Sequence, residues 1–424
     1  MLINFSVKNY LSFKEEVNLS MVASSLKEVY DFPQRAEEKL TNDLSVLPVA
    51  AIYGANASGK SNLLTAIGLM RYFVLHSFAP SNVEGELPAE PFAFSAETEK
   101  EPSEFEATFT NRDIIYRYGF EITNERVVSE WLYQKELKLR SKEREVFFRE
   151  EDELSFHPAL FKVGKVIRDQ KLAKKNVLVS TLAFQLNDEV ANNIVSWFAM
   201  LNLLQGHLDE EFEEISREEI LKHSNIAQKM EDLVRFADTS IEKLNYRSVD
   251  GDPKITTVHM FYNEKGEPVG QKELLLNGQE SAGTKKLFNL SGPIFSSLEF
   301  GEVLIIDEMD SKLHPNLMER LVLMFQDLKL NQNGAQLIFT THNTNILNAR
   351  LLRRDQVWLT EKDSLGATRL YSIADYKTNK GKARNTEALE QNYIEGKYGG
   401  VPFLGNLDNF LEQQIHEQKG PAQE

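Results

Sequence analysis

Hydrophobic and polar positions alternate at the start of the chain. Ile3, Phe5 and Val7 alternate with polar residues, and the alternation resumes over residues 17–21 after a polar turn. Because side chains along a strand point alternately to its two faces, this pattern predicts two half-buried strands. Residues 46–53 instead form an almost continuous apolar run, which is typical of a parallel strand buried on both faces.

The pattern then changes several times along the chain. Apolar residues recur at helical spacing from Leu63 to Phe73, which predicts a helix. Residues 92–133 contain short alternating segments separated by polar turns, which predict an antiparallel sheet. Residues 187–245 have helical periodicity, and the alternation over residues 256–262 leads into the turn signal of a hairpin.

From residue 285 onward helical and strand patterns alternate. Helices are predicted over 285–298 and 316–328, and strands over 303–306 and 336–340. We therefore predict a doubly wound α/β core that is split by an inserted block of strands and helices. The predicted division is an N-terminal part of the core with an antiparallel β lobe (1–185), a helical insertion (186–250) and a C-terminal part of the core (251–424).

Composition and charge narrow the class of protein. The chain has 424 residues and no cysteine, so disulfides, thiolate metal sites and cysteine nucleophiles are excluded, and a reducing cytoplasm is expected. Neither a signal-peptide pattern nor an apolar run of about 20 residues occurs, so we expect a soluble protein with no membrane partner.

The formal net charge of −16 speaks against general electrostatic binding to nucleic acid. Two local strips of basic residues remain as candidate DNA contacts, although the favoured interpretation of each is a solvated surface. The strips consist of Lys162, Lys165, Arg168, Lys171, Lys174 and Lys175, and of Lys377, Lys380, Lys382 and Arg384.

A phosphate-binding loop follows the buried strand. Residues 54–61 read GANASGKS and match G-x-x-x-x-G-K-S between a strand and a helix. Glycines allow backbone N–H groups to face a polyphosphate, and the helix N-terminus adds its positive dipole end. In this pattern Lys60 reaches the β- and γ-phosphates and the Ser61 hydroxyl is a ligand of Mg²⁺. The predicted nucleotide-binding residues are Gly54, Asn56, Ser58, Gly59, Lys60, Ser61 and Asn62.

Two later strands also end in residues that carry chemistry. Asp307 and Glu308 follow the apolar strand at 303–306, so Asp307 is predicted to hold Mg²⁺ through water and Glu308 to deprotonate the attacking water. His342 follows the next strand, where a histidine can donate a hydrogen bond to a γ-phosphate. The predicted catalytic residues are Lys60, Glu308 and His342.

Ser281 and Gly283 mark the start of a predicted helix. A serine there caps the helix, and the free N–H groups of a helix start can bind an anion. By itself this feature indicates no more than a helix cap.

Taken in order, these motifs resemble those of ABC-type ATPases: Walker A, a signature Ser-x-Gly, Walker B with a catalytic Glu, a D-loop and a switch His. Within that superfamily, the turn formed by Leu313, His314 and Pro315 is similar to the RecF and OLD-like branch rather than to transporters, and so are residues 7–13. Residues 355–371 and 393–402 resemble stand-alone ATPases of restriction-linked and abortive-infection loci, such as the ATPase subunit of the PARIS phage-defence system.

The resemblance implies a fold and a composite site. The fold is a P-loop ABC-type ATPase head with a mixed sheet, plus an antiparallel β lobe and an inserted helical subdomain. Two subunits would enclose two ATP molecules with Mg²⁺, and Ser281 and Gly283 of one subunit would contact the γ-phosphate held by Lys60 of the other. Asp310 would be the D-loop residue at the interface, and Gln185 is the candidate Q-loop residue.

The function expected from the resemblance is that of an ATP-hydrolysing regulatory or sensor subunit in an anti-phage, abortive-infection complex. Nucleotide-dependent dimerisation or oligomerisation would control a separate effector, a nuclease encoded nearby, and a phage protein is a candidate trigger. The alternative is a RecF-like DNA-repair ATPase that binds DNA directly. No Asp-x-Asp follows His342, so we expect no TOPRIM nuclease of the OLD type in this chain.

Overall fold

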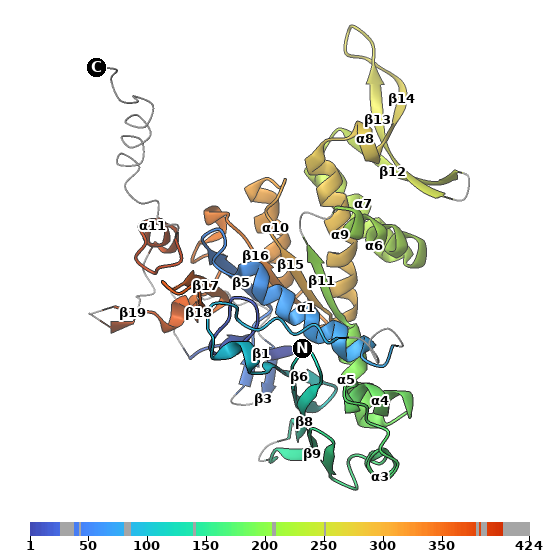
Figure 1. The fold of residues 1–424 in the computed structure, drawn as a ribbon. Coiled ribbons are helices and arrows are strands. Elements are labelled where there is room, and N and C mark those ends of the chain that lie inside the picture. The colour runs from blue at the N-terminus through green and yellow to red at the C-terminus, as the bar shows by residue number, and fades with distance from the viewer. Residues whose placement is uncertain are drawn as a thin grey trace, which may run out of the picture.

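A computed structural model describes residues 1–25, 38–41, 44–79, 86–138, 141–205, 209–249, 252–378, 381–382 and 388–401 of the chain. These residues form a core sheet with helices on both faces, an antiparallel β lobe below it in Figure 1, and a helical lobe that carries a projecting small sheet. The predicted α/β fold, with a mixed core sheet, an antiparallel β lobe and a helical subdomain, is confirmed.

The core sheet has six strands in the order β11-β15-β16-β5-β17-β18. All neighbours are parallel except β17 and β18, so the sheet is mixed. The strands are β11 (Leu201–Gln205), β15 (Val303–Asp307), β16 (Gln336–Thr340), β5 (Val49–Gly54), β17 (Val357–Lys362) and β18 (Thr368–Ser372). The helices next to them are α1 (Lys60–His76), α10 (Pro315–Gln326) and α11 (Leu389–Ile394).

Strand β5 shows why the run before the phosphate loop is apolar at every position. Ala50 and Ile52 pack into the cluster that also contains α1 and the β lobe, whereas Val49, Ala51 and Tyr53 pack into the cluster that contains α10. All six residues of β5 are buried. A central parallel strand covered by helices on both faces has no solvent side, so it has no polar positions.

The β lobe is a seven-stranded sheet in the order β10-β9-β8-β7-β6-β1-β2, with antiparallel neighbours throughout. The antiparallel strands predicted between residues 92 and 133 are confirmed, although the first strand of this segment begins only at residue 103 and the sheet also includes β1, β2 and strands up to residue 156. The strands are β1 (Leu2–Lys8), β2 (Val17–Ser20), β6 (Ser103–Asn111), β7 (Ile114–Ile122), β8 (Val127–Glu136), β9 (Arg144–Glu150) and β10 (Glu153–Phe156). The lobe also carries α3 (Gly164–Asp169), α4 (Val179–Gln185) and α5 (Glu189–Ala199).

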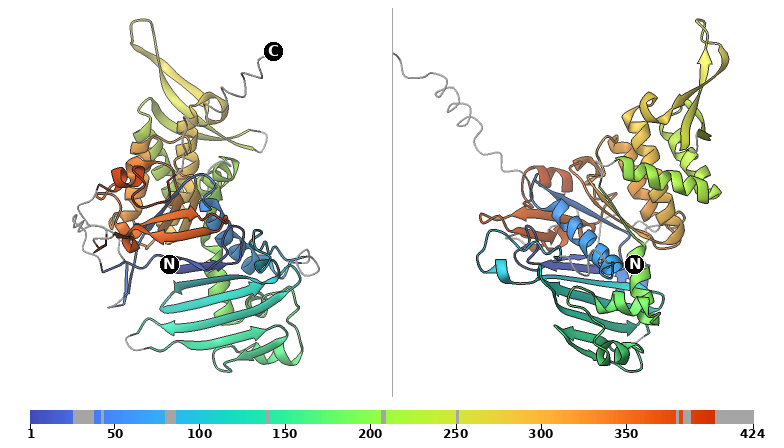
Figure 2. Two further views of the ribbon diagram at one scale, coloured as in Figure 1. Left: turned by 60° about the vertical axis from the view of Figure 1, so that its left-hand side comes forward. Right: turned by 45° about the vertical axis from the view of Figure 1, so that its right-hand side comes forward.

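The helical lobe contains α6 (Asp209–Lys222), α7 (Ser224–Ala237) and α9 (Ala282–Phe300). Three antiparallel strands form what we call the hairpin sheet, which projects from the lobe (Figures 1 and 2): β12 (Ile241–Val249), β13 (Asp252–Tyr262) and β14 (Pro268–Leu275). The short α8 (Leu276–Gln279) connects the hairpin sheet to α9. The predicted hairpin after residue 262 is confirmed by the pairing of β13 with β14.

The helical prediction for residues 187–245 is wrong in two places. β11 lies in this segment and is an edge strand of the core sheet, and β12 begins at Ile241. The domain boundaries drawn at residues 186 and 251 stay a prediction. The remaining strands are β3 (Glu38–Thr41), β4 (Leu44–Val46), β19 (Lys377–Thr378) and β20 (Gly381–Lys382). In the described part of the chain, no helix is both long enough and apolar enough to cross a bilayer.

Candidate nucleotide site

The phosphate loop runs from the end of β5 to the start of α1, and its two outer glycines are required by space. Gly59 has a φ of 106°, and a Cβ there would lie 2.3 Å from the hydroxyl oxygen of Thr368. A Cβ at Gly54 would lie 2.3 Å from the hydroxyl oxygen of Thr360. A side chain fits at neither position, so the motif needs glycine at both for steric reasons.

Lys60 is the first residue of α1, and its side chain folds back over the phosphate loop. Its Nζ donates hydrogen bonds to the carbonyl oxygens of Gly54 at 2.9 Å and Ala55 at 3.0 Å. Burial lowers the pKa of Lys60 below its ordinary value, while the carboxylates of Asp307, Glu308 and Asp310 act in the opposite direction. The ammonium group is thus close to the acids of the next motif.

Polar side chains outside the motif hold the loop in place. Ser58 Oγ lies 2.6 Å from the Thr360 hydroxyl oxygen, and Thr368 Oγ1 donates to the Ser58 carbonyl oxygen at 2.9 Å. Asn62 Nδ2 donates to Ser12 Oγ at 2.7 Å. The side chains of Ser58 and Asn62, both predicted to bind nucleotide, are therefore used for positioning the loop, while Asn56 and Ser61 are exposed.

Sequence reasoning assigned no role to Ser12, Thr360 or Thr368. The only signal was their position in the two segments that carry the family resemblance, residues 7–13 and 355–371. Their spacing in sequence gives no hint that they meet. The pairing of β17 with β5 and with β18 brings Thr360 and Thr368 to the loop, and Ser12 is hydrogen-bonded there to Thr368.

Asp307 and Glu308 lie at the end of β15, two strands away from β5 in the core sheet. Thr340, the last residue of the intervening β16, connects the two acids: its Oγ1 donates to Asp307 Oδ1 at 2.5 Å and accepts from the Glu308 backbone N–H at 2.7 Å. Glu308 has a φ of 48°, an uncommon conformation for a residue with a side chain. Such strained residues cluster at functional sites, which fits the predicted role of Glu308.

His342 follows β16 and completes this edge of the sheet. Its backbone N–H donates to Asp310 Oδ2 at 3.3 Å. Burial lowers the pKa of His342, and the charge of Lys60 lowers it further, while Asp310, Glu308 and Asp307 act in the opposite direction. Five predicted residues therefore interact electrostatically at one edge of the core sheet, where three strands end: Lys60, Asp307, Glu308, Asp310 and His342.

The C-terminal helix α11 supports both the phosphate loop and the segment after His342. The Tyr393 ring packs edge-on against the Tyr53 ring with centroids 5.5 Å apart, and the Tyr53 hydroxyl donates to the Asn343 carbonyl oxygen at 3.0 Å. Glu390 accepts from the Thr344 hydroxyl at 3.0 Å. Tyr393, noted in the sequence only for the resemblance of its segment, therefore has a structural role behind the site.

The predicted signature residues lie elsewhere. Ser281 is the N-cap of α9 and accepts from the Thr284 backbone N–H at 3.1 Å. Figure 1 shows the start of α9, in the helical lobe, well separated from the start of α1. A Cβ at Gly283 would lie 3.5 Å from the Lys312 carbonyl oxygen, so the signature turn lies beside the turn that follows Asp310.

The Q-loop assignment of Gln185 is corrected by the structure. Gln185 ends α4, which lies against the far end of α1, where the Thr181 hydroxyl donates to the Val74 carbonyl oxygen at 2.8 Å. At 1.5 Å per helical residue, Val74 is about 21 Å along α1 from Lys60. Gln185 is therefore not brought to the phosphate loop.

A glutamine that the sequence did not single out is better placed. Gln205 is the last residue of β11 and is paired in register with Asp307 of β15. The carboxyl ends of parallel strands meet at one edge of a sheet, so the Gln205 backbone belongs to the edge that carries the site. The signal was the leucine-rich segment at residues 201–204 (LNLL) just before it, which the helical periodicity of its surroundings concealed.

The first basic strip is exposed at all six positions, around α3 in the β lobe. In the second strip, Lys377 and Lys382 belong to β19 and β20, while Lys380 and Arg384 lie outside the described residues.

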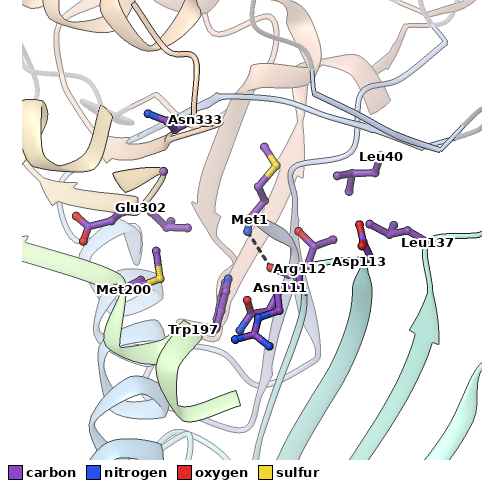
Figure 3. A pocket seen from close by; sticks show the side chains of 13 residues that line it. Met1, Leu40, Asn111, Arg112, Asp113, Leu137, Trp197, Met200, Glu302 and Asn333 are labelled. Carbon is purple, nitrogen blue, oxygen red and sulfur yellow. Dashed lines mark hydrogen bonds between the residues drawn. The ribbon is translucent and has the colours of Figure 1, made fainter. Parts of the chain in front are cut away.

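A pocket of about 370 Å³ lies between the core sheet and the β lobe (Figure 3). Its lining includes Met1, Arg112, Trp197 and Glu302. Glu302 directly precedes β15, whereas Asp307 ends it, so the pocket is at the opposite edge of the sheet from the phosphate loop. It is not part of the candidate nucleotide site.

The chain belongs to the AAA family described as "AAA domain, putative AbiEii toxin, Type IV TA system", whose sequence profile matches residues 49–348. None of the curated proteins compared with the chain matches it significantly. Among solved structures, it is similar to the SMC head domain from Thermotoga maritima, with 16% identity and a TM-score of 0.40 over 88% of this chain and 98% of that one. It is also similar to the Smc head domain bound to the C-terminal domain of ScpA derived from Pyrococcus furiosus, with 12% identity and a TM-score of 0.38 over 88% of this chain and 96% of that one. A third similar structure is the recombination mediator protein RecF with ATP, with 16% identity and a TM-score of 0.27 over 81% of this chain and 92% of that one.

Proposed function

We propose that this member of the AAA family binds and hydrolyses ATP with Mg²⁺ and acts as the regulatory or sensor subunit of an anti-phage, abortive-infection complex. The observation that carries the ATPase assignment is the convergence of Lys60, Asp307, Glu308 and His342 at one edge of the core sheet. The family description, which names a putative AbiEii toxin of a type IV TA system, supports the defence role.

Each of these residues would have a distinct role in phosphoryl transfer. The loop N–H groups and Lys60 would bind and neutralise the phosphates, as the steric need for Gly54 and Gly59 indicates. Glu308 would accept the proton of the attacking water. His342, whose lowered pKa favours the neutral ring at pH 7, would donate a hydrogen bond to a γ-phosphate oxygen.

The residues present fit a magnesium ion shared with the substrate. No group of three or more His, Cys, Asp or Glu side chains in the described residues could hold a metal alone. Mg²⁺ in nucleotide sites uses one or two protein ligands and completes its shell with phosphate oxygens and water. The Ser61 hydroxyl and Asp307 would hold it, and the ion would neutralise charge on the β- and γ-phosphates.

ATP would also bring two copies of the chain together. The start of α9 lies apart from the start of α1 (Figure 1), so we expect Ser281 and Gly283 to contact the nucleotide of a second copy rather than that of their own chain. A second copy supplies them: only the triphosphate would reach both the loop of one copy and the signature turn of the other. This differential contact would make ATP a switch for assembly.

The test is the variant Glu308→Gln. Removing the general base should lower ATP turnover by about 100-fold or more while ATP binding is retained. ATP should then convert the variant to a dimer or larger oligomer in sedimentation velocity, with ADP as the control. Unchanged turnover would refute the assignment of the base, and a chain that stays monomeric with ATP would refute the switch.

The effector part of the proposal needs its own experiment. The chain should co-purify with the product of an adjacent gene, and phage protection in cells should require Lys60. If Lys60→Ala protects cells as well as the parent does, nucleotide control of an effector is wrong.

The second candidate is a RecF-like repair ATPase that binds DNA directly. The observation in its favour is the exposure of the whole first basic strip, from Lys162 to Lys175. Salt-sensitive DNA binding by the purified chain, weakened by charge reversal within this strip, would favour this candidate.

A further inference from the structure

The residue before the signature serine is held by side chains from another element. Glu280 directly precedes Ser281, and only 7% of its side chain is exposed. Its Oε1 lies 2.7 Å from His259 Nε2 and also accepts a hydrogen bond from the Thr257 hydroxyl. Thr257 is completely buried, and its hydroxyl lies 3.1 Å from the same imidazole nitrogen.

These contacts join the hairpin sheet to the start of α9. Thr257 and His259 are two residues apart on β13, so their side chains point to the same face of the hairpin sheet. That face meets Glu280 at the point where the chain enters α9. A buried carboxylate is costly unless hydrogen bonds compensate it, so the backbone at Glu280 is fixed wherever these two partners are fixed.

A second set of contacts reaches the same turn from α7. Asp238, the residue after α7, accepts from the Thr284 hydroxyl at 3.4 Å and from the Ser240 hydroxyl at 2.6 Å. Thr284 in turn lies 2.8 Å from Ser281 Oγ, and Ser240 Oγ lies 3.3 Å from His259 Nδ1. The signature turn is thus closed into one polar network with the hairpin sheet.

The residues that the network positions are themselves exposed. Ser281 and Ala282 are open to solvent, and Gly283 is half-buried. Their own subunit therefore leaves a surface free, while the residues on either side, Glu280 and Thr284, are held.

We propose that Thr257 and His259, acting through Glu280, are positioning residues for the signature turn, and that they set how strongly ATP joins two copies of the chain. The inference rests on the proposed function for its second half. It assigns to the hairpin sheet a role in nucleotide-dependent association, although the sheet lies outside the core and holds no residue of the phosphate loop.

The experiment compares conservative and disruptive changes in the full-length chain with Glu308→Gln as the parent. Glu280→Ala and Thr257→Val remove the contacts, whereas Glu280→Gln and Thr257→Ser keep an acceptor or a donor. Glu264→Ala, at an exposed position in the turn of the same sheet, is the matched control. Measured by sedimentation velocity with ATP, association should weaken by about tenfold or more in the disruptive variants, because a buried polar group loses its partner.

ATP affinity separates positioning from general damage. Each variant should bind a fluorescent ATP analogue with the affinity of the parent at protein concentrations too low for association. The conservative variants and Glu264→Ala should associate within about threefold of the parent, a difference well below the tenfold step. Equal association in all variants, or a parallel loss of ATP affinity, would overturn the proposal.

A further measurement keeps this proposal distinguishable from the proposed function. Hydrogen exchange of the amides at residues 281–286, without nucleotide, should be faster in Glu280→Ala and Thr257→Val than in the parent, and unchanged in Glu264→Ala. If the parent fails to associate with ATP, the proposed switch is wrong, and exchange still decides whether Glu280 positions the turn. Unchanged exchange would refute the positioning itself.

Discussion

The phosphate loop and the signature turn, the two halves of the proposed composite site, are built in different ways. The loop joins a fully buried strand to a helix, and glycines at Gly54 and Gly59 are required because neighbouring side chains leave no room. The signature turn lies on the helical lobe and is held by a network of side-chain hydrogen bonds around Glu280. The loop is therefore fixed by its junction with the buried strand and by close packing against Thr360 and Thr368, whereas the signature turn depends mainly on a few side-chain hydrogen bonds.

This difference predicts which substitutions should affect ATP binding and which should affect the association of two copies. Substitutions at the loop should abolish the nucleotide site of a single copy. Substitutions at the signature turn should leave that site intact and act only when two copies meet.

The largest effect is expected for Lys60→Ala. The variant removes a positive charge that lies in the loop and loses charge-assisted hydrogen bonds to phosphate, so ATP affinity should fall by about 100-fold. Isothermal titration with ATP and Mg²⁺ measures this directly. If Lys60→Ala kept its affinity for ATP, the phosphate loop would not be the part of the composite site that binds the nucleotide of a single copy.

The second effect is expected for Gly283→Asp. A Cβ at this position meets the Lys312 carbonyl oxygen at 3.5 Å and the Ser281 hydroxyl oxygen at 3.8 Å, both ordinary contact distances, so the fold should tolerate the change. A carboxylate placed opposite the partner's γ-phosphate should weaken ATP-dependent association by about tenfold or more. ATP affinity of a single copy should stay the same, and Gly283→Ala is the milder control. A loss of ATP affinity in single copies would show that the turn acts on its own nucleotide.

A smaller effect concerns the pH dependence of ATP binding and His342. Burial and Lys60 lower the pKa of His342 in the free protein, so the ring stays neutral below its ordinary 6.5. A γ-phosphate beside the ring should raise this pKa, so ATP binding takes up a proton and becomes tighter as the pH falls from 7.5 to 5.5. The gain is up to about tenfold for each unit by which the pKa rises.

The variant His342→Gln should lack this gain, and the comparison of the two proteins removes the effect of protonation of ATP itself. Parallel affinity profiles for the parent and the variant would mean that His342 does not face the phosphate.

The smallest effect on the ATPase is expected for reversing the charges of Lys171, Lys174 and Lys175. These residues are exposed on the β lobe, and surface charges contribute little to stability. ATP affinity and turnover should stay within about twofold of the parent, a difference of a few tenths of a kcal/mol. Salt-sensitive DNA binding that is lost in this variant would instead favour the repair function.

Much of the fold could be predicted because its signals are local. The alternation of Ile3, Phe5 and Val7 gave β1, the continuous run gave β5, and the glycines of residues 54–61 gave the strand–loop–helix junction. The wrong parts have a physical cause as well. The strand β11 is only five residues long and lies between helices, so its apolar residues could equally continue a helical pattern.

The sequence by itself determined which residues are candidates for nucleotide chemistry, because a phosphate-loop motif and acids after an apolar strand depend on the spacing of a few residues. Only the tertiary structure decided which distant residues support them. Thr360 and Thr368 reach the loop through strand pairing, and the backbone of Gln205, not that of Gln185, lies in register with Asp307 because β11 joins the sheet beside β15. Likewise Thr257 and His259 meet Glu280 across more than 20 residues of chain. Such contacts depend on the packing of whole elements, and no local pattern of residues records them.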